Sequence, residues 1–569
     1  MRSRAFFNTL IVAAWYLLSR VLGLAREMVI SSQFGTTPAL DAYRAAFAIP
    51  DLIYLVVAGG ALGSAFIPVF SEHLARGDAP GAWRLASGVL NLALVGLLAS
   101  CALVALLADP LVALTVGRGF GAEQRALTAD LVRLLLVQPV LLGLGGLAKA
   151  TLESFERFTL PAVGANLYNL GIIAGALLLA PTLGIYGLVW GVIAGAALFL
   201  LAQLPGLRAV GARYVRPTTD DQRSTANGRP VLRTHAADLP LTAHRTLRER
   251  LARLSFVVRR SSSSDVQRVL RLLAPRLVGQ SAWQLNFVAI ASFASTLGVG
   301  AVAANTYAFQ LMVLPHGLIA LSLATVLFPQ LARHYAAGDL AALRESAARG
   351  VRSVLFLALP ASALLAVLAL PLLRLLFQRG AFDAESAALT AAALSAYALG
   401  LWAFAAAEIP VRAFYAMQDT RTPVAVALAA VALNIGLAWA LLRLGLGVRG
   451  LGLAFSTANV AEAAALLALL ARRTGGTASG FARAAGGMTL ATGAFVAALA
   501  GLLAASQSLL PPLVPGDTYR WPQDFLPLAL WLAAATGLAG AVYLAATWLL
   551  DLEEPRALLS RLQALLVGR

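Results

Sequence analysis

The stretch LASGVLNLALVGLLASCALVALLA, residues 85–108, decides the fold because it is long, apolar and free of charged side chains. An α-helix needs ~20 predominantly apolar residues to cross a hydrocarbon core of ~30 Å. Comparable runs occupy residues 159–180, 350–373, 422–444 and 484–506. These runs are continuous in Leu and Ala and do not alternate with polar residues, which favours membrane-spanning helices over a closed β-barrel.

The composition of the whole chain agrees with a membrane protein. Of its 569 residues, 59% are hydrophobic and 12% are charged, whereas soluble domains carry roughly 25% charged residues. The net charge of +17 comes mostly from arginines that lie between the apolar runs. That placement is typical of cytoplasmic loops of membrane proteins, so we expect no nucleic-acid partner.

Few residues are suited to catalysis or metal binding. Cys101 is the single cysteine, which excludes an intrachain disulfide and a cysteine metal cluster. His73 and His334 lie far apart in the sequence, and His316 stands alone in an apolar segment, so none has metal-ligand spacing. We therefore expect no enzyme, no cofactor and no metal site.

We predict an all-α polytopic membrane protein with about fourteen transmembrane helices. The connections rich in Arg alternate with short or charge-balanced ones, and Arg2 and Arg4 precede the first helix. The positive-inside rule then places both termini in the cytoplasm. The predicted helices are residues 6–30, 39–71, 82–107, 125–150, 159–180, 184–207, 267–297, 301–333, 348–373, 386–417, 420–444, 447–471, 481–506 and 523–550.

The polar segment 208–266 divides the chain into predicted domains. Residues 1–207 form an N-terminal lobe of six helices, and residues 267–471 form a second lobe of six. Residues 472–569 hold two further helices and a cytoplasmic amphipathic tail. Within the polar segment, residues 245–260 have the pattern of a basic helix lying on an anionic lipid surface; a solvated linker without a regulatory role is the alternative.

The chain also contains an internal repeat. Phe66-Ile67-Pro68 followed by His73, Gly77 and Asp78 matches Leu327-Phe328-Pro329 followed by His334, Gly338 and Asp339, at an offset of 261 residues from Pro to Pro. Pro161 and Pro423 form a second match at 262 residues. Six predicted helices separate the copies, so both have the same orientation. Parallel repeats that form two lobes around a midplane cavity are a transporter architecture.

Charged residues within the first two predicted helices are candidates for function, because each costs at least ~2.5–3.5 kcal/mol to insert. At 100° per residue, the polar residues of the first helix share about a third of its circumference. A cationic cavity for an anionic headgroup is one interpretation, since arginine binds phosphate oxygens bidentately. Buried structural ion pairs are the other. The residues concerned are Ser19, Arg20, Gly23, Arg26 and Glu27 in the first helix, and Asp41, Arg44 and Asp51 in the second.

Polar residues in later helices are weaker candidates. Gln284 and Asn286 of the seventh helix and Gln310 of the eighth either bind a sugar or peptide or bond neighbouring helices. Glu408 is a candidate for an ion or proton site. Asp419 lies in a turn, where we expect a helix cap or a loop salt bridge.

The sequence resembles the MurJ/MviN lipid II flippase family, in ordered motifs that cover nearly the whole chain outside residues 208–266. The N-terminal motifs are Ser19-Arg20-Val21-Leu22-Gly23 with Arg26, Phe34-Gly35, Asp41-Ala42, Pro50 and Gly60-Ala61 through Pro68. The later motifs are Arg157-Phe158 with Pro161 and Asn169, Tyr307-Ala308 with Leu311-Met312 and Pro315, Leu376 through Phe382, Ala413 through Ala416 with Asp419, Thr422-Pro423, and Asn434.

The resemblance implies two six-helix lobes of the MOP exporter fold around a central cavity, plus two C-terminal helices. It also implies flipping of lipid II, the undecaprenyl-diphosphate-linked disaccharide-pentapeptide, across the bacterial inner membrane, among membrane lipids and other cell-wall synthesis proteins. Arg20 and Arg26 match family cavity arginines and would hold the diphosphate, with Glu27 and Asp41 orienting them. Asn434 matches a residue of an ion-coupling site.

This chain departs from the family pattern at several positions. The family usually has Arg at the positions of Tyr54 and Leu55, Glu at Gly59, an Asp-Arg pair at Phe309-Gln310, and Asp at Ile290. Three functions stay open at this point: a lipid II flippase, a related exporter of another polyprenyl-diphosphate glycan or of small molecules, and a non-transporting membrane scaffold for cell-wall synthesis.

Overall fold

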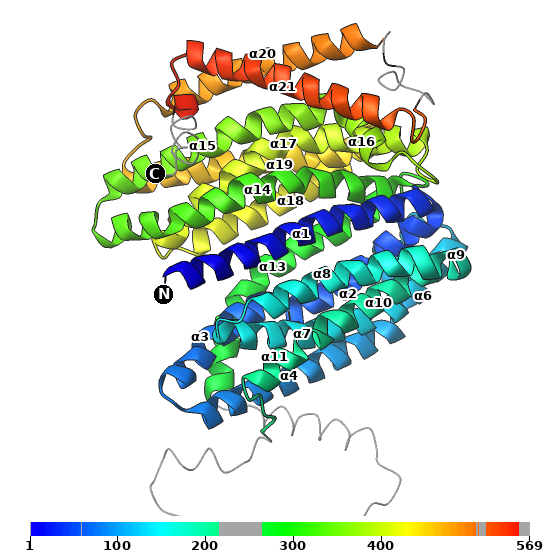
Figure 1. Ribbon diagram of the computed structural model, residues 1–569, viewed down its shortest axis with the longest axis vertical. Coiled ribbons are helices and arrows are strands. Elements are labelled where there is room, and N and C mark those ends of the chain that lie inside the picture. Colours follow the sequence, from blue (N-terminus) through cyan, green and yellow to red (C-terminus); the bar gives the residue numbers. More distant parts are fainter. Residues whose placement is uncertain (1, 59, 216–263, 508–509, 511–518, 557–569) are drawn as a thin grey trace, which may run out of the picture. The chain divides into compact units, whose positions relative to one another are not determined.

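The computed structural model describes residues 2–58, 60–215, 264–507, 510 and 519–556, and these residues fold into helices without any strand (Figure 1). The predicted basic helix at residues 245–260 and the end of the C-terminal tail lie outside the described residues. The helices are α1 (Arg2–Phe34), α2 (Pro38–Ala58), α3 (Gly60–Ala75), α4 (Ala79–Leu106), α5 (Ala108–Leu114), α6 (Ala122–Leu135), α7 (Val137–Ser154), α8 (Thr159–Ala174), the π-helix η1 (Gly175–Leu179), α9 (Ala180–Leu183), α10 (Ile185–Leu201), α11 (Leu204–Ala209), α13 (Ser264–Ser295), α14 (Ala301–Ala336), α15 (Leu340–Val367), α16 (Ala369–Phe377), α17 (Ala384–Ala416), α18 (Arg421–Arg443), α19 (Gly447–Thr474), α20 (Phe481–Ser506) and α21 (Phe525–Leu549).

The all-α membrane fold is confirmed. Within the described residues, eleven helical segments are long and apolar enough to cross a membrane. They include α4, α14, α15 and every helix from α17 to α21, together with the segments 122–154, 159–183 and 185–209. Segments α1, α2, α3 and α13 are not among the eleven. The count of fourteen therefore stays a prediction.

Proline residues interrupt two of the predicted helices. The predicted helix 125–150 is two helices, α6 and α7, that meet at Leu136 shortly before Pro139. The predicted helix 348–373 is likewise divided at Leu368, three residues before Pro371. Proline has no N–H for the helical hydrogen bond and its ring clashes with the preceding turn. Residues 122–154 still form one segment long enough to span the membrane, whereas the spanning segment of the second prediction ends at Val367 and not at residue 373.

The chain separates into two compact units. Unit 1 comprises Met1–Arg26, Ala46–Val112 and Thr128–Leu285, and unit 2 comprises Glu27–Ala45, Ala113–Leu127 and Asn286–Arg569. In unit 1, α8 and η1 approach α10 closely at glycine residues. A Cβ on Gly171 would lie 2.4 Å from the Cα of Gly195, and one on Gly175 would lie 2.3 Å from the Cα of Gly191. Small residues let membrane helices approach closely and gain van der Waals contact.

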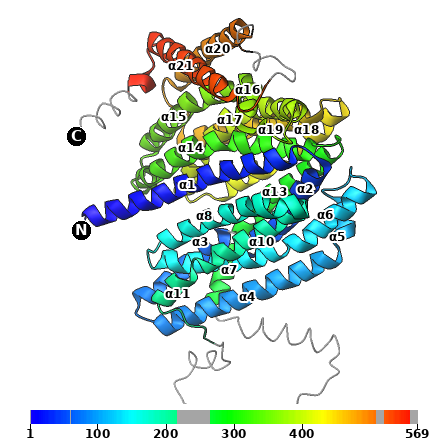
Figure 2. The same ribbon diagram turned by 45° about the vertical axis from the view of Figure 1, so that its right-hand side comes forward.

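In unit 2, α14, α15, α17 and α19 pack against one another and share one apolar core. The last two helices, α20 and α21, lie side by side next to α15, as both views show (Figures 1 and 2). A hydrogen bond also joins α21 to α15: the Tyr543 hydroxyl donates to the backbone oxygen of Phe356 at 2.9 Å.

Both copies of the first sequence repeat form the same turn between two helices. Gly77 follows α3 with φ +73°, and Gly338 follows α14 with φ +72°. Glycine is favoured in this left-handed conformation, which ends a helix. Asp78 and Asp339 then cap α4 and α15, each accepting from the backbone N–H three residues on, at 2.9 and 2.8 Å.

The second repeat also has matching backbone geometry. Glu156 has φ +59° in the turn before Pro161, and Gln418 has φ +60° in the turn before Pro423. Both pairs are separated by the same 262 residues. A left-handed conformation is uncommon for residues with a Cβ, so its occurrence at equivalent places supports an internal duplication.

Candidate functional site: polar clusters within the two units

In unit 1, the polar face of α1 contacts α8. The Nη1 of Arg26 donates a hydrogen bond of 3.1 Å to the Oδ1 of Asn169. The amide nitrogen of Asn169 in turn lies 3.5 Å from both the backbone oxygen and the hydroxyl of Ser19. The structure thus joins Ser19 and Arg26 through a third residue. Because Asn169 is buried, its amide fixes the position of the Arg26 guanidinium.

The other predicted residues of α1 have different surroundings. Arg20 is exposed on its helix. At Gly23 an added Cβ would meet nothing within 4 Å, so this part of α1 borders open space. Space beside an exposed arginine is compatible with a bound anion.

Asp51 on α2 belongs to a second polar contact of unit 1. The Nε2 of Gln138 lies 3.4 Å from an Asp51 carboxylate oxygen and 3.3 Å from the hydroxyl of Tyr168. Gln138 is buried on α7, and Tyr168 is the neighbour of Asn169 on α8. Four helices, α1, α2, α7 and α8, therefore contribute polar groups to these two contacts.

In unit 2, Glu27 and Arg44 form a buried ion pair between α1 and α2, with 6% and 9% of their side chains exposed. The Arg44 guanidinium also lies over the ring of Tyr307, 5.0 Å from its centre. A guanidinium on an aromatic face gains a cation–π attraction. Glu27 and Arg44, both predicted site residues, are therefore each other's ion-pair partners.

Asp41 is fully buried and caps a distant helix. One carboxylate oxygen accepts from the N–H of Gly300 at 2.6 Å and the other from the N–H of Ala303 at 2.7 Å. These are among the first N–H groups of α14, which lack partners within the helix. A carboxylate at a helix N-terminus also stabilises the positive end of the helix dipole.

Two motifs that support the family resemblance contact each other within unit 2. The backbone N–H of Ala381 donates to the oxygen of Ser32 at 2.8 Å. Gly35 and Gly380 both have positive φ there, and a Cβ on either would lie within 2.2 Å of a backbone oxygen of the other turn. Glycine at both positions allows this close approach.

The amide candidates have mixed surroundings. Gln284 donates to the backbone oxygen of Ala48 at 3.4 Å in unit 1. In unit 2, Asn434 donates to Asn286 at 2.8 Å, and both are buried. Among the described residues, the buried oxygens of Asn434 and Gln310 have no hydrogen-bond partner. The Asn286–Asn434 contact agrees with the expectation that such groups bond neighbouring helices.

Phe309 and Ile290, two of the departures from the family pattern, lie in apolar surroundings. Phe309 makes edge contacts with Phe287, Tyr397 and Phe455, at ring-centre distances of 5.2 to 5.7 Å. Ile290 is buried. An acidic residue at either place would need a new polar partner, so these substitutions fit the packing observed here.

Glu408 has two charged or chargeable neighbours. His316, which stands alone in the sequence of its helix, lies with its Nε2 3.7 Å from one Glu408 oxygen. The Nη2 of Arg412 lies 3.6 Å from the other. The position of His316 in the sequence gave no sign of this contact, which exists because α14 and α17 pack together.

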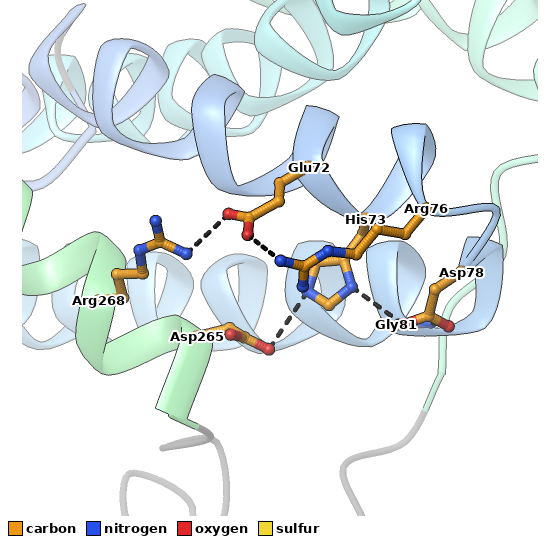
Figure 3. A network of polar contacts seen from close by, with 7 residues as sticks. All are labelled: Glu72, His73, Arg76, Asp78, Gly81, Asp265 and Arg268. Carbon is orange, nitrogen blue, oxygen red and sulfur yellow. Dashed lines mark hydrogen bonds and ion pairs between the residues drawn. The ribbon is translucent and has the colours of Figure 1, made fainter.

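A polar network surrounds the turn between α3 and α4 (Figure 3). His73 lies between two carboxylates, with Nδ1 2.9 Å from Asp78 and Nε2 3.2 Å from Asp265. The backbone N–H of Gly81 and, to a smaller extent, His73 hold the pKa of Asp78 below its usual range. Beside it, Glu72 binds both Arg76 and Arg268, the latter at 2.7 Å. The first turn of α13 is thus tied to the end of α3.

Asp419 acts as predicted. It accepts from the backbone N–H of Thr422 at 3.0 Å and from that residue's hydroxyl at 2.7 Å. It also pairs with Arg473 at 3.2 Å. These bonds, with the Thr422 N–H contributing most, lower the pKa of Asp419.

The sequence did not single out Gln138, Tyr168 or Glu462 as site residues. Gln138 and Tyr168 carry polar atoms in apolar segments, a signal that could have identified them. Their partners come from other helices, however, and periodicity along one helix does not reveal contacts between helices.

Comparisons with known proteins agree on one family. Residues 30–516 match the family model "Lipid II flippase MurJ". The chain is 31% identical to the lipid II flippase MurJ of Burkholderia cenocepacia over 427 residues, covering 74% of this chain and 75% of that protein. It is 29% identical to a probable lipid II flippase MurJ of Rhizobium meliloti, covering 74% and 72%.

Solved structures show the same fold. The structure titled "Lipid II flippase MurJ, inward closed conformation" superposes with a TM-score of 0.70 at 21% identity, covering 94% of this chain and 98% of that chain. An inward-facing multidrug resistance transporter of the MATE family gives a TM-score of 0.62 at 16% identity, covering 80% and 94%.

Proposed function

Because this chain belongs to the lipid II flippase MurJ family, we propose that it moves lipid II across the bacterial cytoplasmic membrane. The family match over residues 30–516 is the observation that carries this proposal. Two six-helix lobes, residues 1–207 and 267–471, expose the substrate site to each side in turn, without hydrolysis. Both termini lie in the cytoplasm, and residues 208–266 form a cytoplasmic linker.

Arg26 and Arg20 bind the diphosphate of the substrate in this proposal. A guanidinium presents five N–H donors in a planar fork that matches phosphate oxygens. The bond from Arg26 to Asn169 and the contact of Asn169 with Ser19 support this role, because they hold Arg26 in one orientation. The open space at Gly23 supports a neighbouring anion.

The remaining predicted residues position helices, bind other parts of the substrate or couple an ion. Glu27, Asp41, Arg44 and Asp51 set the positions of α1, α2 and α14 through the contacts described above. Gln284, Asn286 and Gln310 bind the sugar or peptide part, and Glu408 and Asn434 belong to an ion-coupling site. Cell-wall synthesis proteins are proposed as further partners.

A lipid II accessibility assay tests the proposal. In a flippase-depleted strain that expresses this chain, lipid II should become accessible at the outer face and growth should be restored. Arg26→Ala should abolish both while the protein stays in the membrane. Arg472→Ala, at an exposed arginine near the end of α19, is the matched control and should restore growth.

Other outcomes would favour the alternatives. Export of another polyprenyl-diphosphate glycan, or of small molecules, without any change in lipid II sidedness would indicate a related exporter. Restored growth by the Arg26→Ala variant would contradict the assignment of Arg26 and favour a non-transporting scaffold.

A further inference from the structure

His316 of α14 is buried in unit 2 next to an acidic residue to which it is not hydrogen-bonded. Its ring stacks on Phe404 of α17, with ring centres 4.1 Å apart. Its Nε2 faces Glu408 at 3.7 Å, beyond hydrogen-bond length, and has no hydrogen-bond partner among the described residues. Only 5% of the residue is exposed. A buried polar atom without a partner is unfavourable, so this arrangement needs an explanation.

Glu408 lies between two groups that can carry a positive charge. Arg412 lies 3.6 Å from its second oxygen, and His316 lies 3.7 Å from its first. Glu462 of α19 is a further titratable group near Glu408. Charges in a membrane interior are paired or neutralised.

A proton is the ligand that this geometry accommodates. A proton on Nε2 would make His316 an imidazolium, which donates where the neutral ring has no partner and faces the carboxylate of Glu408. Histidine is the side chain that changes charge between pH 5 and 8. A metal ion fits less well, because Arg412 would repel it and the described residues contain no group of three or more ligands suited to a metal.

We propose that His316 and Glu408 form a proton-binding site inside unit 2, which couples proton movement to lipid II flipping. The Nε2 lone pair of His316 takes up a proton, and the N–H so formed donates to Glu408. Release of the proton restores the present 3.7 Å separation. The coupling part rests on the proposed function, whereas proton binding does not.

Histidine NMR tests proton binding without any transport. The chain has 5 histidines, and a difference spectrum against His316→Gln assigns the signal of His316 in the full-length protein in nanodiscs. We expect this imidazole to gain a proton between pH 8 and 5. Glu408→Gln keeps the shape of the side chain and should lower the proton affinity of His316 roughly tenfold, because it removes the negative charge that stabilises the imidazolium.

A control variant and two possible results test the titration of His316 further. His334→Gln, at the end of α14, should leave the titration of His316 unchanged. A His316 ring that stays neutral down to pH 5, or a titration that Glu408→Gln does not change, would overturn the site.

A transport assay then tests coupling. In proteoliposomes, a pH gradient should accelerate lipid II flipping by the wild type, and Glu408→Gln should abolish that acceleration. If the rate of lipid II flipping by the wild type does not depend on the pH gradient, the coupling is overturned and the flippase assignment stands. A lack of any flipping by a folded wild type, with a normal His316 titration, would overturn the proposed function and leave the proton site in place.

Discussion

Glu27 of α1 and Arg44 of α2 form a buried ion pair, 17 residues apart in the chain, next to the ring of Tyr307. Removing one partner leaves the other charge buried and unpaired, which typically costs 3–5 kcal/mol. We therefore expect Glu27→Gln to lower the unfolding free energy by about 3 kcal/mol. Thermal unfolding of the purified protein in detergent measures this loss.

The matched control is the exposed pair of Glu72 and Arg76, in which Arg76 is 68% exposed. Arg76→Gln should cost less than about 1 kcal/mol. If Glu27→Gln is equally mild but abolishes flipping, the pair serves transport and not stability. If the double variant Glu27→Leu/Arg44→Met recovers stability and flipping, the pair is purely structural.

Asp41 should be needed as a carboxylate. Asp41→Asn replaces one acceptor with an amide N–H that faces the N–H of Gly300 or Ala303. The loss of a cap costs about 1 kcal/mol, and a buried unsatisfied donor adds about 1–3 kcal/mol. Hydrogen exchange should then increase at the first turn of α14. Asp339→Asn is the control, because the Asp339 cap on α15 is exposed.

Gly380 should not tolerate alanine. Its φ is +58°, and an added Cβ would lie 2.2 Å from the backbone oxygen of Ser32. The left-handed conformation alone costs an L-residue about 1–2 kcal/mol, and the clash adds to this. We expect Gly380→Ala to reduce the amount of folded protein in the membrane. Gly436→Ala in α18 provides the control, since open space surrounds that position; equal losses in both variants would contradict the explanation.

Acid should weaken the turn between α3 and α4. The folded protein holds the pKa of Asp78 below its usual range, chiefly through the N–H of Gly81. Such a carboxylate stabilises the folded state above its unfolded pKa of about 3.9, and this contribution disappears as the pH falls through the lower folded value. Unfolding of the wild type should therefore become easier from about pH 4 downwards.

Asp78→Asn is the comparison for this pH dependence. The variant should be less stable at neutral pH and should show a flatter decline in acid. Parallel stability curves for the variant and the wild type would contradict the role of Asp78. Asp419 offers an independent repetition, because its pKa is lowered by the N–H of Thr422.

The sequence predicts helices well where the physical signal is local. The length of the apolar run identifies α4 and α18. Asp339 marks the start of α15, because its carboxylate accepts a hydrogen bond from the backbone N–H three residues later. By contrast, Asp41 caps an N–H that is 259 residues away, and His316 meets Glu408 only because α14 packs on α17. Periodicity along one helix gives the face of a residue but not the helix opposite, so such contacts require the tertiary structure.

The equivalent turns at Gly77 and Gly338 indicate how this protein evolved. Two segments of one orientation with the same turn, cap and spacing indicate that a gene for half of this protein was copied and fused. After fusion each copy was free to diverge. His73 binds Asp265 across the turn, whereas the Nε2 of His334 has no hydrogen-bond partner among the described residues. The histidine is present in both halves, and the first half uses it to connect α3 to α13.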